Sequence, residues 1–382
     1  MNRSEIVSLT TSLVEIASHE DETAVGDEIE SWLRTETSGS VRRDTAGNVI
    51  ARRQPTESAN REDRDEQAER DTTEPTEHTS LALVGHHDVV PPAERQVNES
   101  GDYRVEAHNG RLYGRGTADM KGPLAAAMLA FRDAEPQAEL VFASFVGEEQ
   151  GGLGAQQAIE EGFAPTRAIV VEGSTGYSAP GVLDVAVAHK GRRGSTITAT
   201  GRAGHASRPE AADNAVYRAC DAIEIVRSLE APETTVLDNT LAGSVAVTEI
   251  DGGSAWNVIP ERCTVTIDER TVPGETAALD QVESVEGVEW TVDQELPSMA
   301  CGDSAFANRV CAAATAVQPG KPELVAKPHA TDAGWLSSAG TDCVVCGAAE
   351  PGEAHTADES VSIEVLAWSY ELYRRVASAK MN

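Results

Sequence analysis

Hydrophobic side chains recur at helical spacing near the start of the chain and in short uninterrupted runs further along it. Residues 4–17 and about 24–35 show the three-to-four-residue spacing of amphipathic helices. The segments LALVGHHDVVP, ELVFASFVGEE and TRAIVVEGSTG are instead apolar runs of strand length, each followed by polar residues. Between the first two, GRLYGRGTADMKGPLAAAMLAF is typical of a loop that leads into a helix. This alternation predicts an α/β fold with a mixed, mostly parallel sheet.

The pattern changes near Ala188. From about residue 190 to 295, strands of alternating polarity surround one long helix, which is predicted over about 212–229. We therefore predict a smaller α+β domain at 190–295, inserted into a domain built from residues 1–189 and 296–382. The last part of the chain returns to apolar strands, contains GEAHTADE with His355 and Glu359, and is predicted to end in a helix near 361–378.

One segment within the first domain follows neither pattern. Gln54 to Ser80 is polar, acidic and almost free of large apolar side chains. Such a segment buries too little surface to offset the entropy lost on ordering, so it is predicted to be a mobile acidic loop.

Composition narrows the possible partners. The chain has 382 residues, an apolar fraction of 40% and a net charge of −32, which together favour two globular domains with a strongly acidic surface. Such a surface repels nucleic acid and anionic membranes. Lysine is nearly absent, and the carboxylate excess resembles proteins of halophiles that accumulate salt, where screening acts within about 3 Å at 1 M.

The compartment is predicted to be the cytoplasm. The first twenty residues are amphipathic without the apolar core of a signal peptide, and no apolar run is long enough to span a bilayer. The six cysteines do not form a dense disulfide framework for a chain of this size. Cys343 and Cys346 form a C-x-x-C, but inside the apolar TDCVVCG, which favours a buried strand over a redox or zinc site.

Candidate chemistry gathers where the predicted strands end. Because ligand sites in parallel sheets form at the carboxyl ends of strands, the acids and histidines there are expected to lie close together. They are His86, Asp88, Asp119, Glu148, Glu149 and Glu172. Glu148 and Glu149 are adjacent, and neighbouring side chains at a strand end point in different directions. One carboxylate can therefore hold a metal while the other accepts a proton from water, as metal-assisted hydrolysis requires.

These residues, with a late histidine, supply enough ligands for two metal ions. The set of two imidazoles and three carboxylates is His86, Asp119, Glu149, Glu172 and His355. Such ligands suit zinc, cobalt or manganese, and five ligands hold two ions only if one carboxylate bridges them. Taken singly, each residue has a plainer interpretation: the glutamate pair could lie in a solvated loop, and Asp119 could be a helix N-cap.

Taken together, the motifs resemble a known family. GHHDVVP, GRGTADMKG, EEQGG, VEG, GHASRP and GEAH match, in order and spacing, the M20 family of dinuclear zinc peptidases and deacylases. That family includes acetylornithine deacetylase, succinyl-diaminopimelate desuccinylase and carboxypeptidase G2. The match spans essentially the whole chain apart from the acidic loop.

The resemblance implies a role for each residue of the first domain. Asp119 would bridge two metal ions, of which zinc is the first expectation, with cobalt or manganese possible. His86 and Glu172 would complete one metal site, and Glu149 and His355 the other. Asp88 would orient the imidazole of His86. Glu148 would be the general base, which takes a proton from the attacking water and passes it to the leaving amine.

It also implies roles for the inserted domain. His205 would reach the active site of a partner subunit and stabilise the tetrahedral oxyanion, which implies a homodimer formed through residues 190–295. Asn257 and Arg270 would contact the substrate carboxylate, for which an arginine fork is well suited. Structural alternatives remain, because His205 could cap a turn and Arg270 could pair with a surface acid.

The expected activity is metal-dependent cleavage of the amide of an N-acyl amino acid, of the acetylornithine or succinyl-diaminopimelate kind. A carboxypeptidase or dipeptidase of the same family is the alternative, with a small peptide as substrate. A pseudoenzyme that keeps the fold for binding would be expected to lack Glu148 or a ligand, and neither is missing. Two departures from the family pattern affect substrate preference: no proline follows the acid in VVEGSTG, and DERTVP varies the common arginine motif.

Overall fold

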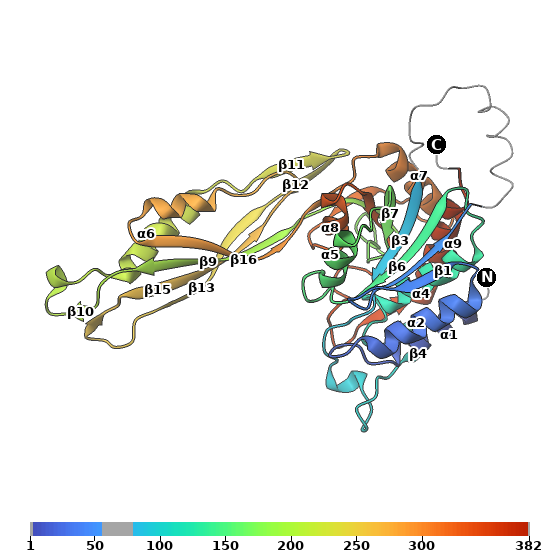
Figure 1. Cartoon of the computed structure of the whole chain (residues 1–382), viewed down its shortest axis with the longest axis horizontal. Coiled ribbons are helices and arrows are strands. Elements are labelled where there is room, and N and C mark those ends of the chain that lie inside the picture. The colour runs from blue at the N-terminus through green and yellow to red at the C-terminus, as the bar shows by residue number, and fades with distance from the viewer. Residues whose placement is uncertain (1–2, 56–78, 381–382) are drawn as a thin grey trace. The chain divides into compact units, whose positions relative to one another are not determined.

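In a computed structural model of the chain, residues 3–55 and 79–380 are described, and they form two units (Figure 1). The first unit contains Met1–Ala188, Ala300–Lys327 and Thr331–Asn382, and the second contains His189–Met299 and Pro328–Ala330. The chain thus leaves the first unit at His189 and returns to it at Ala300, and it leaves again only for the three residues Pro328–Ala330. The predicted acidic loop falls almost wholly on residues 56–78, which lie outside the described residues.

A nine-stranded mixed sheet forms the centre of the first unit. Its middle strands are parallel and run in the order β6 (Glu139–Phe145), β3 (Ser80–His86), β7 (Arg167–Val170) and β19 (Asp342–Val345). Antiparallel strands extend it on both sides: β2 (Val49–Arg53) and β1 (Ser40–Arg43) next to β6, and β8 (Val185–His189) next to β19. β17 (Met299–Ala300) and β18 (Leu324–Lys327) pair at the β8 edge. The predicted mixed, mostly parallel sheet is confirmed.

Helices cover this sheet because their apolar faces need a partner. α4 (Lys121–Asp133) is buried over most of its length and packs on β3 and β6, with α1 (Arg3–Val14) and α9 (Ile363–Ala377) beside it. α2 (Thr23–Glu36) packs on β1 and β2. α1, α2 and α9 lie close to the predicted helical ranges. The other α-helices in the described part of this unit are α5 (Leu153–Glu160), α7 (Ser304–Thr315) and α8 (Ala333–Ser338).

The first unit also contains a small three-stranded sheet, which the sequence did not predict. It consists of β4 (Glu106–His108), β5 (Arg111–Tyr113) and β20 (Ser360–Ser362), in the order β20-β5-β4. Each strand has three residues, too few for a clear alternation of polarity. This sheet joins the segment before α4 to the segment that follows His355.

The second unit is a four-stranded antiparallel sheet with a helix on one face (Figure 1). The strand order is β13 (Ser244–Gly252), β15 (Arg262–Arg270), β9 (Arg192–Thr200) and β16 (Val288–Leu296). α6 (Ala215–Ser228), close to the predicted helix, and the 3-10 helix η3 (Leu279–Ser284) pack against the sheet around a core that includes Ile197, Val265 and Ile267. Two short pairs complete the unit: β10 (Gly204–His205) with β14 (Val258–Ile259), and β11 (Glu233–Val236) with β12 (Asn239–Ala242).

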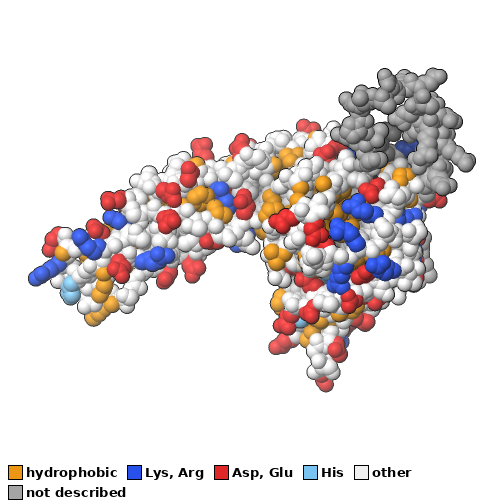
Figure 2. All heavy atoms as spheres, viewed as in Figure 1, with side chains coloured by type: hydrophobic (Ala, Val, Ile, Leu, Met, Phe, Trp, Pro, Cys, Tyr) orange, Lys and Arg blue, Asp and Glu red, His pale blue; other side chains and the backbone are white. Residues whose placement is uncertain are grey.

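Two features of composition have structural counterparts. Cys343 lies in β19 and Cys346 directly follows it; both are buried and free, as a strand in the core requires. Acidic side chains are dispersed over the face shown in Figure 2 rather than gathered in one patch. A halophilic origin stays a prediction. Within the described ranges, no helix combines the length and apolar character needed to cross a bilayer.

Candidate metal centre

Three neighbouring parallel strands deliver acids and a histidine to one edge of the main sheet. His86 is the last residue of β3, which lies between β6 and β7 and pairs with both. Glu148 and Glu149 follow β6, and Glu172 follows β7. The expectation that these strand ends converge is confirmed. The reason given for the glutamate pair needs correction: both residues lie in a turn beyond β6, not at the strand end, so strand alternation does not separate them.

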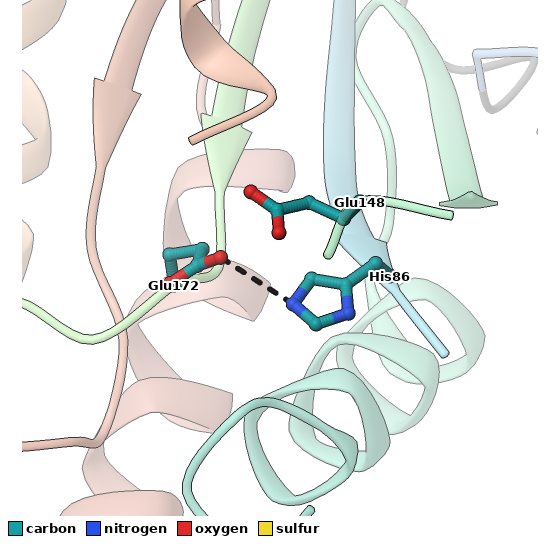
Figure 3. Close-up of side chains that lie close together, drawn as sticks. All are labelled: His86, Glu148 and Glu172. Carbon is teal, nitrogen blue, oxygen red and sulfur yellow. Dashed lines mark ion pairs between the residues drawn. The ribbon is translucent and has the colours of Figure 1, made fainter. Parts of the chain in front are cut away.

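One group of potential ligands consists of His86, Glu148 and Glu172, which offer atoms within 4.8 Å of one another. Figure 3 shows the Glu148 carboxylate directed into the space above the ion pair of Glu172 and His86. His86 Nε2 lies 3.4 Å from Glu172 Oε1. The second oxygen of Glu172 lies 3.8 Å from Nζ of Lys327, which is buried in the first unit.

A second group consists of Asp119, Glu149 and His355, again within 4.8 Å. His355 Nε2 lies 2.8 Å from Glu149 Oε1 and 3.1 Å from Asp119 Oδ2. The other oxygen of Asp119, Oδ1, lies 3.1 Å from His86 Nε2. The carboxylate of Asp119 therefore joins the two groups, with one oxygen directed to each histidine.

Asp88 contacts one residue of each ligand group, His86 and Glu149. His86 Nδ1 lies 3.1 Å from the carbonyl oxygen of Asp88, which can accept a hydrogen on Nδ1, and 3.2 Å from the carboxylate oxygen Oδ1 of the same residue. Asp88 Oδ2 accepts the backbone N–H of Glu149 at 3.0 Å. Holding the proton on Nδ1 leaves Nε2 of His86 as the atom with a free lone pair, which is the arrangement metal-binding histidines require.

The adjacent histidine has a structural role. His87 is fully buried, and its Nδ1 lies 2.7 Å from the Ser144 hydroxyl in β6. Burial lowers the pKa of His87 to about 3, so this imidazole is neutral at physiological pH. It fastens the end of β3 to the neighbouring strand.

His355 has an unusual backbone. Its φ is +61°, in the left-handed region that non-glycine residues rarely adopt. A single such residue is destabilising by about 1–2 kcal/mol, and such outliers persist where the surrounding structure over-determines them. The backbone of His355 is therefore locally destabilising, and the same conformation directs its imidazole toward Asp119 and Glu149.

The electrostatics favour positive charge at the point where the two groups meet. Hydrogen bonds to the carboxylates of Asp119 and Glu149 raise the pKa of the His355 imidazole to about 10. Burial alone would raise the pKa of Asp119, but hydrogen bonds to His355 and His86 hold it well below its usual range. Burial raises the pKa of the Glu148 carboxyl well above its usual range. These carboxylates stabilise a cation in their midst.

The donor set fits divalent metal ions. Each group offers imidazole nitrogen and carboxylate oxygen, the ligands that zinc and neighbouring transition metals share. A bridging carboxylate between paired sites is what ions about 3.5–4 Å apart need. Asp119, with its oxygens directed to His86 and His355, stands where such a bridge would be.

Two of the predicted residues in the second unit lie side by side. His205 pairs with Val258, and the carbonyl of Asn257 accepts the N–H of Ala206 at 2.9 Å. Both His205 and Asn257 are exposed. His205 Nδ1 accepts the N–H of Ser207 at 3.2 Å and lies 2.7 Å from the Ser207 hydroxyl.

Arg270 lies at the other end of this unit. It is the last residue of β15, whose first residue, Arg262, is at the end near His205. The eight-residue separation along a strand is about 26 Å. The guanidinium of Arg270 pairs with Asp268, with Nε 2.8 Å from Oδ1. Within the second unit, Arg270 is therefore separated from His205 and Asn257, and its contact with a substrate carboxylate stays a prediction.

Sequence reasoning missed several groups around the site. Asp332, at the start of α8, is 3% exposed, and burial raises its pKa to about 8. Lys327 pairs with Glu172, as described above. Glu359 accepts the backbone N–H of Asp119 directly, although in the sequence it is simply one acid of GEAHTADE. A buried acid among 63 acidic residues has no distinguishing sequence signal.

Comparisons with known proteins agree with this geometry. Residues 82–379 match the family model of peptidase family M20/M25/M40. The chain is 30% identical over 309 residues to acetylornithine deacetylase of Myxococcus xanthus, covering 75% of this chain and 76% of that one. It is 29% identical over 326 residues to succinyl-diaminopimelate desuccinylase of Novosphingobium aromaticivorans, covering 79% and 82%. Its fold is similar to that of aminopeptidase PepT from Bacillus cereus, with a TM-score of 0.77, 18% identity and coverage of 99% and 98%.

The chain belongs to peptidase family M20/M25/M40. Members of the M20 family are metal-dependent hydrolases with a catalytic domain and an inserted dimerisation domain. The predicted family and fold class are confirmed. The particular roles of the candidate site residues stay predictions, for the candidate ligands as well as for the rest: His86, Asp88, Asp119, Glu148, Glu149, Glu172, His205, Asn257, Arg270 and His355.

Proposed function

We propose that the chain is a hydrolase with two metal ions that cleaves the amide bond of N-acyl amino acids. One observation carries the proposal: Asp119 directs one oxygen to His86 and the other to His355, at 3.1 Å each, so that it can bridge the two ligand groups. His86 and Glu172 would hold one ion, and Glu149 and His355 the other. Zinc is the expected metal, with cobalt or manganese as alternatives for this ligand set.

Bound metal ions would supply Lewis-acid polarisation of the scissile carbonyl and lower the pKa of water. The chain would supply the proton transfers and the orientation. Glu148 would accept the proton of the attacking water and donate it to the leaving nitrogen. A carboxyl with a raised pKa suits both halves of that task, because it must first gain and then lose the proton near neutral pH. Asp88 would keep His86 in the tautomer that leaves Nε2 available.

His205 would stabilise the negative oxygen of the tetrahedral intermediate. Its Nδ1 accepts the N–H of Ser207, which places the hydrogen of a neutral imidazole on Nε2 as a free donor. Asn257, next to it, would contact the substrate, and so would Arg270. Because Arg270 and His205 lie at opposite ends of the second unit, a role for both in one reaction is simplest if His205 acts on a partner subunit.

We propose that this partner is a second copy of the chain, joined through the second unit. β13 is an edge strand of nine residues, and its free edge is a template for pairing with another strand. Tyr217 in α6 and Ile250 in β13 are 70% and 50% exposed, and α6 contacts β13. Two copies that meet along β13 and α6 would cover both side chains.

The substrate class follows the relatives. Acetylornithine deacetylase and succinyl-diaminopimelate desuccinylase are named for removing an acyl group from an amino acid, and both match most of this chain. A metallo-exopeptidase that acts on a small peptide is the second candidate, since the fold is shared with an aminopeptidase. Both activities would use the same metal ions and the same general base, Glu148.

An assay of amine release separates these candidates. The substrates would be N-acetylornithine, N-succinyl-diaminopimelate, other N-acyl amino acids and several dipeptides, in molar KCl with zinc or cobalt. We expect turnover of an acylated amino acid that a chelator abolishes and added metal restores. Cleavage of dipeptides alone would favour the exopeptidase. Turnover that survives complete removal of metal would contradict the proposal.

A further inference from the structure

Glu359 is an acid that the metal chemistry does not use but that contacts the metal-site loop. Its side chain is buried, with 1% of the residue exposed. Its Oε1 accepts three backbone N–H groups, from Gly116 at 2.8 Å, Ala118 at 3.0 Å and Asp119 at 3.1 Å. One carboxylate oxygen thus fixes the backbone on which Asp119 is carried.

The second oxygen of Glu359 has a charged partner. Oε2 accepts a hydrogen bond from Arg115 at 2.5 Å, and that guanidinium is itself buried and donates to the carbonyl of Pro91. The backbone carbonyl of Glu359 accepts the N–H of Gly114 at 3.1 Å. The 114–119 loop is therefore held along its whole length by one residue.

Glu359 also belongs to the segment that supplies His355. It follows His355 by four residues and directly precedes β20, which pairs with β5. On the other side of His355, Glu353 forms an ion pair with Arg111 of β5, whose guanidinium also contacts Ser360. The segment with the strained φ of His355 is thus anchored before and after that residue.

We propose that Glu359 is a positioning residue that sets Asp119 relative to His355, and thereby sets the affinity of the Asp119–Glu149–His355 group for a divalent cation. The inference rests on the proposed function, since it requires that this group bind metal. The distances that matter are those from His355 Nε2 to Asp119 Oδ2 and Glu149 Oε1. They join segments more than 200 residues apart in sequence, and Glu359 links two of those segments through the four hydrogen bonds of its carboxylate.

The chemistry of the carboxylate suggests a selective substitution. A carboxylate only accepts hydrogen bonds, and here both oxygens face donors. In Glu359→Gln, the amide oxygen can still accept the three backbone N–H groups, but the amide nitrogen would face the guanidinium of Arg115. The variant therefore keeps the volume of the side chain and its bonds to the 114–119 loop, but it loses the hydrogen bond to Arg115.

A matched control exists in the second unit. Glu269 is also fully buried; it accepts a hydrogen bond from Arg193 Nε at 2.7 Å and one from the Ala277 N–H at 2.6 Å. Every candidate metal ligand lies in the first unit. Glu269→Gln disturbs a similar buried pair, so it reports the loss of stability that follows from such a change alone.

The experiment is calorimetric titration of the metal-free full chain with zinc, together with thermal unfolding of the metal-free protein. For Glu359→Gln we expect affinity at one of the two sites to fall about 10–100-fold, the range seen when a residue that orients a ligand is changed. For Glu269→Gln we expect a comparable fall in melting temperature with wild-type zinc affinity. Arg115→Lys keeps the charge but loses the planar guanidinium. Its zinc affinity is expected to lie between those of the wild type and Glu359→Gln.

Wild-type zinc affinity at both sites in Glu359→Gln, with a melting temperature lowered as in Glu269→Gln, would show that Glu359 is only structural. If Glu359→Gln does not fold, the zinc affinity and melting temperature of Arg115→Lys distinguish a positioning role of Glu359 from a structural one in the same way. A wild-type chain that binds no zinc would overturn the proposed function and this inference together, whereas unchanged affinity in the variants overturns this inference alone.

Discussion

The two units differ in how their strands are buried, and this difference determines where each can hold a site. β3 in the first unit is buried at all seven positions, because the sheet is buried on both faces. β15 in the second unit alternates between buried and less buried positions, because α6 and η3 cover only one face. A doubly covered sheet meets solvent at its strand ends, and the metal-type side chains of the first unit are found there.

The exposed apolar side chains show the same contrast. Of the six large hydrophobic residues that are exposed among the described ones, only Leu153 belongs to the first unit. The other five are Tyr217, Ile250, Trp256, Val258 and Val292. The first unit brings its candidate ligands together by itself, whereas the second displays His205 and Asn257 on an exposed surface. This contrast agrees with the proposal that the first unit holds the metal ions and that His205 of the second unit acts on a partner.

The largest effect is expected from changing Glu148, the proposed general base of the first unit. Glu148→Gln should lower turnover by about 10⁴-fold, the upper part of the range for general acid–base catalysis, and should leave two metal ions bound. Turnover of an N-acyl amino acid and metal content measured on the same sample check both halves of this expectation.

The neighbouring residue provides the control for Glu148. Glu149→Gln should lose metal, because Glu149 Oε1 is 2.8 Å from His355 Nε2 in the second ligand group. Loss of metal from Glu148→Gln instead would assign Glu148 as a ligand beside His86 and Glu172, since the three lie within one group. Near wild-type turnover in Glu148→Gln would contradict the assigned mechanism.

A smaller effect is expected in the second unit. His205→Ala should lower turnover by roughly 10²–10³-fold, as the loss of one oxyanion donor does, with metal content unchanged. If His205 acts on the partner subunit, mixing this variant with Glu148→Gln should restore activity. Random exchange gives dimers of which half are mixed, each with one intact site, so about a quarter of wild-type turnover should return. No recovery after verified exchange would place His205 in the site of its own subunit or outside catalysis.

Much of this contrast could be predicted from the sequence, because each pattern has a local cause. Apolar runs predict buried parallel strands, alternation predicts a sheet covered on one face, and the carboxyl ends of parallel strands lie at one edge. His86, Glu149 and Glu172 therefore came together without knowledge of side-chain contacts. The bridging role of Asp119 rested instead on the family resemblance.

What escaped prediction depends on contacts between distant segments. Glu359 differs from other acids only because the chain returns to the 114–119 loop about 240 residues later. The three-residue strands β4, β5 and β20 create that return, and they are too short to leave a pattern. The separation of Glu148 from Glu149 also comes from a turn whose geometry the sequence shows only as a glycine-rich stretch.

The smallest expected effect concerns association rather than chemistry. Tyr217→Glu and Ile250→Glu place charges on α6 and on the free edge of β13, where the dimer is proposed to form. Burying an unpaired charge at such a position weakens binding by about 2 kcal/mol or more, roughly 30-fold in Kd. Sedimentation velocity at micromolar concentration should therefore show monomer where the wild type is dimeric.

Val292→Glu is the matched control, since Val292 is 38% exposed on β16 at the opposite edge of the same sheet. If Val292→Glu dissociates the protein and the other variants do not, the interface lies on β16. If the monomeric variants keep full turnover, His205 is not supplied by a partner. The proposal that the second unit acts on the site of a partner subunit would then be wrong.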